Sequence, residues 1–464
     1  MFGNITGLSI GLGLNMGLAT LCSQAYGAGR AERDNGLHLR RCALVLCITF
    51  LFSSAAALFC APVLRAFAQP DAVAAASARY AQVQLLGVPF FWGASALQTV
   101  CDGLQETKPG LYANGGSSVV QLLLSVVAIH PSLLGWGYLG MAAARAVGGV
   151  VQFCLMVALI RARRLERLVW RVPADAWGGP KRRVYSWRSL SAYLAVAMPG
   201  AVIVCVEWWA FEAFSILVGL LDSPAVALAA HGTMFNILVV TYMTFTGLST
   251  ALCACTGKYI GAGRGCVVPA LCMRAVSIAV TLSVAICAVL QLLARPLGHL
   301  FTNDLAVVDL IDQSMIGPAL SVPGYAVLMT LYGACRGADH QRVAALGTFL
   351  GYAIGLPLGF ALGVKLMWPR PLVGIWLGNV TALAFAAVWV SIIVVRKDWS
   401  NVKVVIQWDL ANRVSVADSM QPAAPCEPME QPARTQVSGS VPLLLGVPQE
   451  VMSTEPTSLR HSRE

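Results

Sequence analysis

The chain has 464 residues, of which 57% are hydrophobic and only 12% are charged, and its mean hydropathy is +0.69. Ordinary soluble domains contain about 25% charged residues, so this composition excludes a soluble core for most of the chain. The formal net charge of +10 is divided among separate short loops. This distribution argues against a nucleic-acid partner, which would need one basic patch.

Apolar blocks recur in chain order, and about 20 helical residues at 1.5 Å each cross a bilayer. We predict eleven transmembrane helices, near residues 3–25, 42–67, 79–103, 112–130, 133–161, 190–221, 225–256, 269–295, 313–335, 343–366 and 372–395. The region 112–161 can also be divided differently. The predicted fold class is an all-α polytopic membrane protein.

Basic residues follow every second predicted helix. Examples are Arg30 after the first, Lys108 after the third, Arg161 to Arg188 after the fifth and Lys397 after the last. Because basic loops stay in the cytoplasm, we predict a cytoplasmic C-terminus and, with an odd number of helices, an external Met1. Residues 397–464 are rich in Pro, Ser, Gln and Glu and are predicted to form a disordered cytoplasmic tail. The plasma membrane and a vacuole-like membrane both remain open.

The chain repeats itself at an offset of 234 residues. Gly27-Ala28-Gly29-Arg30 recurs as Gly261-Ala262-Gly263-Arg264, and the same offset joins Arg40 with Arg274, Pro89 with Pro323, and Gly103 with Gly337. We predict an N-terminal lobe of five helices in residues 1–161, a basic cytoplasmic linker in 162–189 and a C-terminal lobe of six helices in 190–396. Such parallel repeats, related by a pseudo-two-fold axis along the membrane normal, are a transporter architecture.

The offset also indicates an unequal pair of lobes. The helix at 190–221 opens the second lobe, and its partner would precede Met1. We therefore expect the first lobe to lack its opening helix. Either the sequence is a truncated gene model, which we favour because an open lobe exposes polar groups to lipid, or a real short form exists.

Charged residues inside the predicted helices are informative because each costs free energy in lipid and usually faces a cavity or a partner. Three stand out, namely Arg145, Glu207 and Glu212. Five residues at about 100° each separate the two glutamates, so they point in different directions and only one is expected to be central. A carboxyl group shielded from water holds a proton more readily, and releases it when an organic cation approaches. Trp208 and Trp209 would add cation-π attraction of about 0.5 to 2 kcal/mol.

Each of these residues has a structural alternative. Glu207 can be a buried hydrogen-bonding member of the bundle, and the tryptophans can belong to the membrane interface. Arg145 can pair with a buried carboxylate or bind an anionic substrate directly. Pro199 breaks the helical hydrogen-bond ladder, which permits bending during transport or only a static kink.

Cofactor chemistry finds no support in the sequence. The fourteen cysteines are scattered singly through apolar helices and read as small buried residues, so we expect no metal site. Gly27-Ala28-Gly29 lacks the context of a phosphate loop. We expect no enzyme activity and no cofactor, only a proton or sodium gradient as the energy source.

Several stretches carry a family resemblance, including Ser23 to Gly29, Glu207 to Glu212, Arg336-Gly337, Gly355 to Gly359 and Gly374-Ile375-Trp376. Over residues 2 to 400 the chain resembles the eukaryotic type of the multidrug and toxic compound extrusion (MATE) family. The resemblance implies twelve helices, one more than the eleven found, and proton-coupled export of organic cations, drugs or metabolites. It implies that Glu207 handles protons and cations and that Glu212 is a second acidic position.

The chain departs from the family pattern at four positions. Ala19, Asn236 and Tyr325 stand where relatives carry acids, and Arg145 stands where relatives carry asparagine. The cavity is therefore expected to be less negative, so a cation stays the favoured substrate but a zwitterionic or anionic metabolite also becomes credible. Asn236, Tyr325 and Tyr352 are expected to contact substrate through hydrogen bonds or ring faces.

The leading hypothesis is a monomeric secondary active efflux antiporter that binds a small organic substrate within the lipid bilayer. One alternative is a flippase of related architecture for lipid-linked substrates, which would need a larger and more basic cavity. Another is a truncated membrane protein without transport activity.

Overall fold

The computed structural model describes residues 7–66, 71–172, 185–402, 404 and 405. These residues belong to one compact unit, Met1–Ala423, and those in regular secondary structure are helical. The predicted tail beyond residue 405 and residues 173–184 of the predicted linker lie outside the described residues.

The N-lobe is the group of helices that comes first in the chain. It contains α1 (Ser9–Gly27), α2 (Ala31–Leu58), α3 (Cys60–Ala66), α4 (Asp71–Leu85), α5 (Val88–Gly103), α6 (Lys108–Ile129) and α7 (Gly137–Ala162). A short helix, α8 (Glu166–Val169), follows in the linker.

The C-lobe is formed by the later helices. It contains α9 (Trp187–Val218), α10 (Pro224–Gly261), α11 (Val268–Leu292), α12 (Ala294–Phe301), α13 (Leu305–Ser314), α14 (Ile316–Gly337), α15 (Gln341–Phe360) and α16 (Pro371–Arg396). A 3-10 turn, Gly265–Val267, precedes α11, and a π-helical turn, Ala361–Lys365, extends α15.

The structure confirms a polytopic all-α fold. Within the described part of the chain, eight helices are long and apolar enough to cross a membrane, and α13 with α14, bent by 48°, makes a ninth if the pair is one broken span. The other two of the eleven predicted spans fall on α1, with 19 residues, and on the pair α4 and α5. The predicted span 79–103 is interrupted at Gly87 because Pro89 has no N–H to continue the ladder and sits in the first turn of α5.

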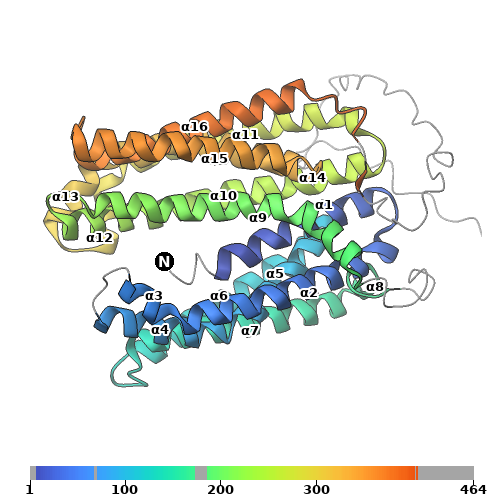
Figure 1. Cartoon of the computed structure of the whole chain (residues 1–464), viewed down its shortest axis with the longest axis horizontal. Coiled ribbons are helices and arrows are strands. Elements are labelled where there is room, and N and C mark those ends of the chain that lie inside the picture. Colours follow the sequence, from blue (N-terminus) through green and yellow to red (C-terminus); the bar gives the residue numbers. More distant parts are fainter. Residues whose placement is uncertain (1–6, 67–70, 173–184, 403, 406–464) are drawn as a thin grey trace, which may run out of the picture. The chain divides into compact units, whose positions relative to one another are not determined.

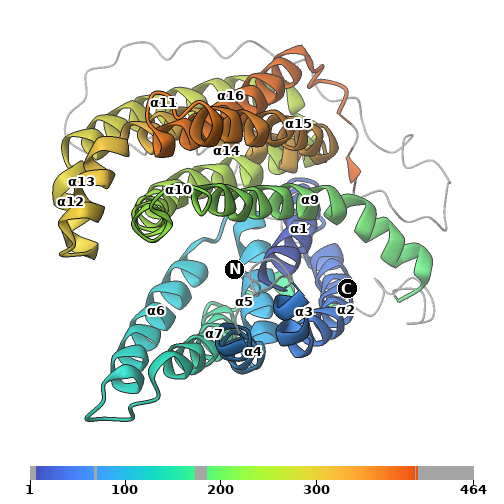
Figure 2. The same ribbon diagram turned by 60° about the vertical axis from the view of Figure 1, so that its left-hand side comes forward.

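The helix α1 joins the two lobes. It packs against α2 and α5 of the N-lobe and against α9, α10 and α14 of the C-lobe, and Figures 1 and 2 show it running close to α9. Small residues permit this approach, since a Cβ on Gly13 would lie only 2.4 Å from Ala201 Cα. Polar contacts add to it: Thr20 Oγ1 donates to the Arg336 carbonyl at 2.7 Å, and Gln24 Nε2 donates to the Gly337 carbonyl at 2.9 Å.

The offset of 234 residues also relates backbone features of the two lobes. Gly29 and Gly263 have positive φ angles of 69° and 71°. A Cβ on Gly27 would meet the Lys258 carbonyl oxygen at 2.0 Å, and a Cβ on Gly261 would meet the Gln24 carbonyl oxygen at 2.2 Å. Since 24 plus 234 is 258, the two contacts are reciprocal, as a two-fold axis between α1 and α10 requires.

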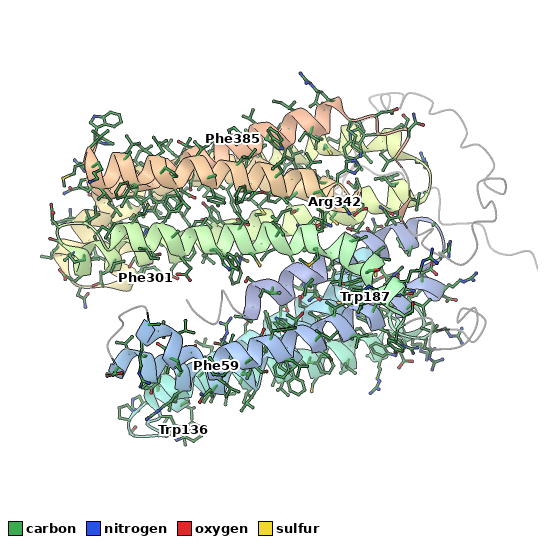
Figure 3. The ribbon with its side chains drawn as sticks, viewed as in Figure 1. Phe59, Trp136, Trp187, Phe301, Arg342 and Phe385 are labelled. Atoms are coloured by element: carbon green, nitrogen blue, oxygen red, sulfur yellow. The ribbon has the colours of Figure 1, made fainter. Side chains whose placement is uncertain are left out.

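The two ends of the helices differ in their side chains. Figure 3 places Trp187 and Arg342 toward one end and Phe59, Trp136 and Phe301 toward the other. Arg342 lies in the first turn of α15 and is one of the basic residues that follow the ninth predicted helix, on which the predicted orientation rests. Which end faces the cytoplasm stays a prediction.

Candidate functional site

Glu207 lies in the buried interior of the C-lobe. It belongs to α9, and its side chain is only 8% exposed. Its neighbours along α9, Val206 and Phe211, pack against the C-lobe core. None of the ion pairs between described residues includes Glu207, so no basic side chain of the described chain neutralises it there.

Four tyrosines from three other helices lie close enough to interact with Glu207: Tyr242 of α10, Tyr325 and Tyr332 of α14, and Tyr352 of α15. The Tyr325 hydroxyl is within hydrogen-bonding reach of the carboxyl group. The rings of Tyr242 and Tyr325 are stacked, with centroids 3.6 Å apart and planes within 10°. The arrangement combines one acid with several ring faces and hydroxyls.

Neighbouring hydroxyls hold some of these tyrosines in place. The Tyr242 hydroxyl lies 2.8 Å from Ser321 Oγ, and the Tyr332 hydroxyl contacts Thr348 Oγ1. Tyr242 is thus held at both its ring and its hydroxyl, and Tyr332 at its hydroxyl, so these two groups near Glu207 are preorganised.

Other buried polar atoms of this region make no hydrogen bond of good geometry with the described residues. Asn379 of α16 is 1% exposed and lies within reach of the Tyr242 hydroxyl, yet neither of its amide atoms makes a hydrogen bond of good geometry with a described residue. The same holds for the Tyr352 hydroxyl and for Nε1 of Trp376. Buried polar atoms are normally paired, so these donors and acceptors are suited to a bound molecule.

The residues next to Glu207 along α9 point elsewhere. Trp208 packs against the N-lobe core, Trp209 is 47% exposed, and Glu212 is half-buried. This follows from the turn of about 100° per residue. The structure therefore does not bring the two tryptophans or Glu212 to the same side as Glu207.

The remaining predicted residues are divided between different places. Tyr325 and Tyr352 lie in the Glu207 site, as described above. Asn236 is exposed on α10, and Pro199 lies inside α9, which continues through it as one helix. Figure 2 shows α9 changing direction along its length.

Arg145 lies in a separate pocket of the N-lobe. The pocket has a volume of about 380 Å³ and is lined by residues of α1, α4, α5, α6 and α7 together with Leu8 and Gly87. Arg145 of α7 is exposed within this lining. Glu207 and Arg145, both predicted from their charge, thus belong to different lobes.

Sequence reasoning missed Tyr242, Tyr332 and Asn379. Each is a polar residue inside an apolar helix, which is a usable signal. What the sequence lacked was a way to tell which of the many hydroxyl and amide groups share a lobe interior with Glu207.

Comparisons with known proteins agree on one family. The family model described as MatE matches residues 1–127 and 199–361. Multidrug and toxin extrusion protein 2 from Oryctolagus cuniculus is 28% identical over 405 residues, which is 86% of this chain and 64% of that protein. Multidrug and toxin extrusion protein 1 from Homo sapiens is 27% identical over 405 residues, covering 86% of this chain and 67% of that protein. The chain thus spans 64% of the length of the rabbit relative.

Solved structures share the fold. The crystal structure of the eukaryotic MATE transporter AtDTX14 superposes with a TM-score of 0.77 at 21% identity, covering 86% of each chain. A mutant of the Vibrio cholerae MATE transporter VcmN gives a TM-score of 0.71 at 18% identity, covering 85% of this chain and 87% of that chain. The resemblance inferred from the sequence is confirmed.

Proposed function

The chain belongs to the MatE family, and from this premise we propose that it is a secondary active antiporter that exports small organic molecules in exchange for protons. The observation that carries the proposal is Glu207, an acid buried among tyrosines without a basic partner in the described chain. Transport would follow from rocking of the two lobes about their shared contacts.

The coupling follows from the cost of burying a charge. An isolated carboxylate in a low-dielectric interior is several kcal/mol less stable than in water, and a proton or a bound cation removes that cost. Either a proton or a cation is enough to neutralise the carboxylate, so the two compete for Glu207. Competition for one site that opens alternately to each side of the membrane is sufficient for exchange.

The surroundings of Glu207 suit an organic cation. The stacked rings of Tyr242 and Tyr325 offer π faces, which attract cations by about 0.5 to 2 kcal/mol. The unpartnered amide of Asn379 and hydroxyl of Tyr352 can orient polar groups of the same substrate. Sodium in place of the proton would use the same carboxylate.

The other predicted residues take supporting roles in this proposal. Glu212 and Asn236 would contact the substrate at a second, less buried position on its route through the protein. Trp208 and Trp209 would lie beside that position. Pro199 would let α9 bend as the lobes move.

A transport assay tests the proposal. The whole chain is reconstituted in liposomes with an acidic interior, and uptake of a fluorescent organic cation is followed. Glu207→Gln, which keeps the size of the side chain, should reduce proton-driven uptake by about 100-fold or more, and Glu207→Asp should restore part of it.

The matched control is Glu166→Gln in α8, where the glutamate pairs with exposed Arg161 and Arg171. This variant should transport like the wild type. Unchanged uptake in a correctly folded Glu207→Gln variant would reject the role of Glu207.

The alternatives receive no specific support. A flippase for lipid-linked substrates needs a larger and more basic cavity than the N-lobe pocket of about 380 Å³, whose described lining contains one base. A protein without transport activity would show no gradient-driven uptake in the same assay.

A further inference from the structure

The N-lobe pocket has the size and lining of a site for a small molecule. Its volume of about 380 Å³ falls in the usual range for ligand pockets, about 300 to 1,000 Å³. Amide and hydroxyl side chains dominate its lining: Gln84, Ser95, Gln98, Asn114, Gln121 and Gln152. Helix surfaces that only pack against apolar neighbours rarely carry so many polar side chains.

Among the described residues that line this pocket, Arg145 alone is charged. It lies eight residues into α7, which is about 12 Å from the start of the helix, where an unpaired charge facing lipid would be costly. No ion pair between described residues includes it. The pocket therefore offers a guanidinium group whose charge is not balanced by an acid in the lining.

The polar groups around Arg145 are organised by hydrogen bonds. Gln152 Nε2 donates to Asn114 Oδ1 at 2.6 Å, and Asn114 Nδ2 donates to Gln98 Oε1 at 3.1 Å. This chain runs across α7, α6 and α5, so it fixes amide groups from three helices around one cavity. The site is built from its own contacts before any ligand arrives.

The pocket is the N-lobe counterpart of the Glu207 site. Adding 234 to the lining residues Leu8, Phe91, Ser118 and Arg145 gives Tyr242, Tyr325, Tyr352 and Asn379. The same offset converts the contact between Gln98 and Asn114 into the contact between Tyr332 and Thr348. Glu207 itself has no counterpart among the described residues of the N-lobe.

The two related sites thus carry opposite charges, a buried acid among tyrosines in the C-lobe and a base among amides in the N-lobe pocket. We propose that the N-lobe pocket is a second binding site, which takes a small molecule with a carboxylate group through Arg145. A guanidinium group binds a carboxylate through two parallel hydrogen bonds, and the amides can hydrogen-bond the remainder of the ligand. This site binds its ligand whether or not Glu207 exchanges protons for cations.

Binding of salicylate to the whole purified chain in detergent tests the proposal. Salicylate fits the pocket and is fluorescent, and salicylamide is its uncharged analogue. Salicylate should bind saturably and at least ten times more tightly than salicylamide. Arg145→Gln should weaken salicylate binding by about ten-fold or more, since it removes the charge-assisted contact.

Two further variants keep the test decisive if Arg145→Gln folds poorly. Ser118→Tyr retains the arginine but fills the pocket with the residue that the C-lobe has at the matching position, Tyr352, and it should weaken salicylate binding by at least as much as Arg145→Gln does. Arg295→Gln, which changes an exposed arginine paired with Asp309 in the C-lobe, should bind salicylate normally.

Glu207→Gln separates this proposal from the antiport mechanism, because it should leave salicylate binding unchanged. Equal binding of salicylate by the wild type, Arg145→Gln and Ser118→Tyr would overturn the proposal, as would equal affinities for salicylate and salicylamide. Loss of binding in Glu207→Gln would place the ligand in the C-lobe instead and would also overturn it.

Discussion

The two lobes have related backbones but different interiors. In the C-lobe, Glu207 is buried among Tyr242, Tyr325 and Tyr352, whereas at the matching positions of the N-lobe Leu8, Phe91 and Ser118 line an open pocket with Arg145. The comparison teaches that the repeat places a polar site at the same position in both lobes, while a few side chains decide its charge and whether it is filled or open. The variants below alter this difference in order of expected effect.

Moving the base of the N-lobe into the C-lobe should have the largest effect. Asn379 is the counterpart of Arg145, and Asn379→Arg would place a guanidinium group near Glu207. A stable internal ion pair would then replace exchange of protons and cations, so cation uptake should fall by about 100-fold or more. Uptake is measured in liposomes, after size-exclusion chromatography has shown that the variant is folded.

Asn379→Leu serves as the control, because it removes the amide without adding a charge and should retain more uptake than Asn379→Arg. If both variants transport equally, charge at this position does not matter and the contrast between the lobes loses its functional meaning.

Adding a methyl group where the lobes cross should cost stability equally on both sides. A Cβ on Gly27 or on Gly261 would overlap a carbonyl oxygen of the opposite helix, at 2.0 and 2.2 Å. Gly27→Ala and Gly261→Ala should each destabilise the chain by about 1 to 3 kcal/mol, as overpacking does. Thermal unfolding in detergent measures this loss.

Gly115→Ala in α6 is the matched control, since a Cβ there meets nothing within 4 Å, and its effect should stay within about 0.5 kcal/mol. A marked loss in only one of the two crossing variants would contradict the reciprocal packing of α1 and α10.

Exchanging one hydroxyl group between the lobes should have a smaller effect. Tyr325→Phe gives the C-lobe the ring that the N-lobe has at Phe91, and it removes a hydroxyl within reach of Glu207. A neutral hydrogen bond contributes about 1 kcal/mol, so the rate of cation uptake should fall by about five-fold. The converse variant, Phe91→Tyr, should leave cation uptake unchanged, and a drop there would show that both lobes handle the cation.

The smallest expected effect concerns a loop position that carries a titratable side chain in the C-lobe and an uncharged amide in the N-lobe. Asp339, between α14 and α15, is the counterpart of Gln105, and both have positive φ angles. Burial raises the pKa of Asp339 from its usual 3.8 to about 6, while nearby Arg342 and Lys397 oppose the shift. The folded state holds this proton more tightly than the unfolded state does. The contribution of protonated Asp339 to the free energy of unfolding is therefore fully present below pH 4 and is lost as the pH rises to about 6.

Asp339→Asn removes this titration, and asparagine tolerates the positive φ. The difference in unfolding free energy between the wild type and this variant should therefore decline from pH 4 to pH 6, by about 1 kcal/mol or less for a partly exposed group. A difference that does not change with pH would show that Asp339 ionises alike in both states.

Much of the fold was accessible from the sequence because apolar length is a local property. The helices at α6, α7, α9, α10 and α16 lie within a few residues of their predicted ranges. The start of α2 at Ala31 was missed, because Glu32, Arg33 and Arg40 are good helix formers that an apolar criterion cannot see. The break before α5 was missed because a proline that starts a helix resembles one inside it until the backbone is known.

The candidate site was only partly predictable. A charged residue in an apolar helix is recognisable from its residue type alone, because any charge is costly in lipid. This criterion selected Glu207, Glu212 and Arg145 but could not rank them. The choice between the two glutamates and the position of Trp208 depend on what packs against each face of α9. These are properties of neighbouring helices, which a single stretch of sequence does not contain.

The sequence by itself determined that the chain crosses the membrane many times, that it contains two related halves offset by 234 residues, and which family it resembles. Hydrophobic length and internal similarity lie along the chain and need no folding to be read. Only the tertiary structure decided that Glu207 is buried with tyrosines from three other helices and that Arg145 lines the matching pocket of the other lobe. Such contacts join residues far apart in the chain, so they exist only once the helices have packed.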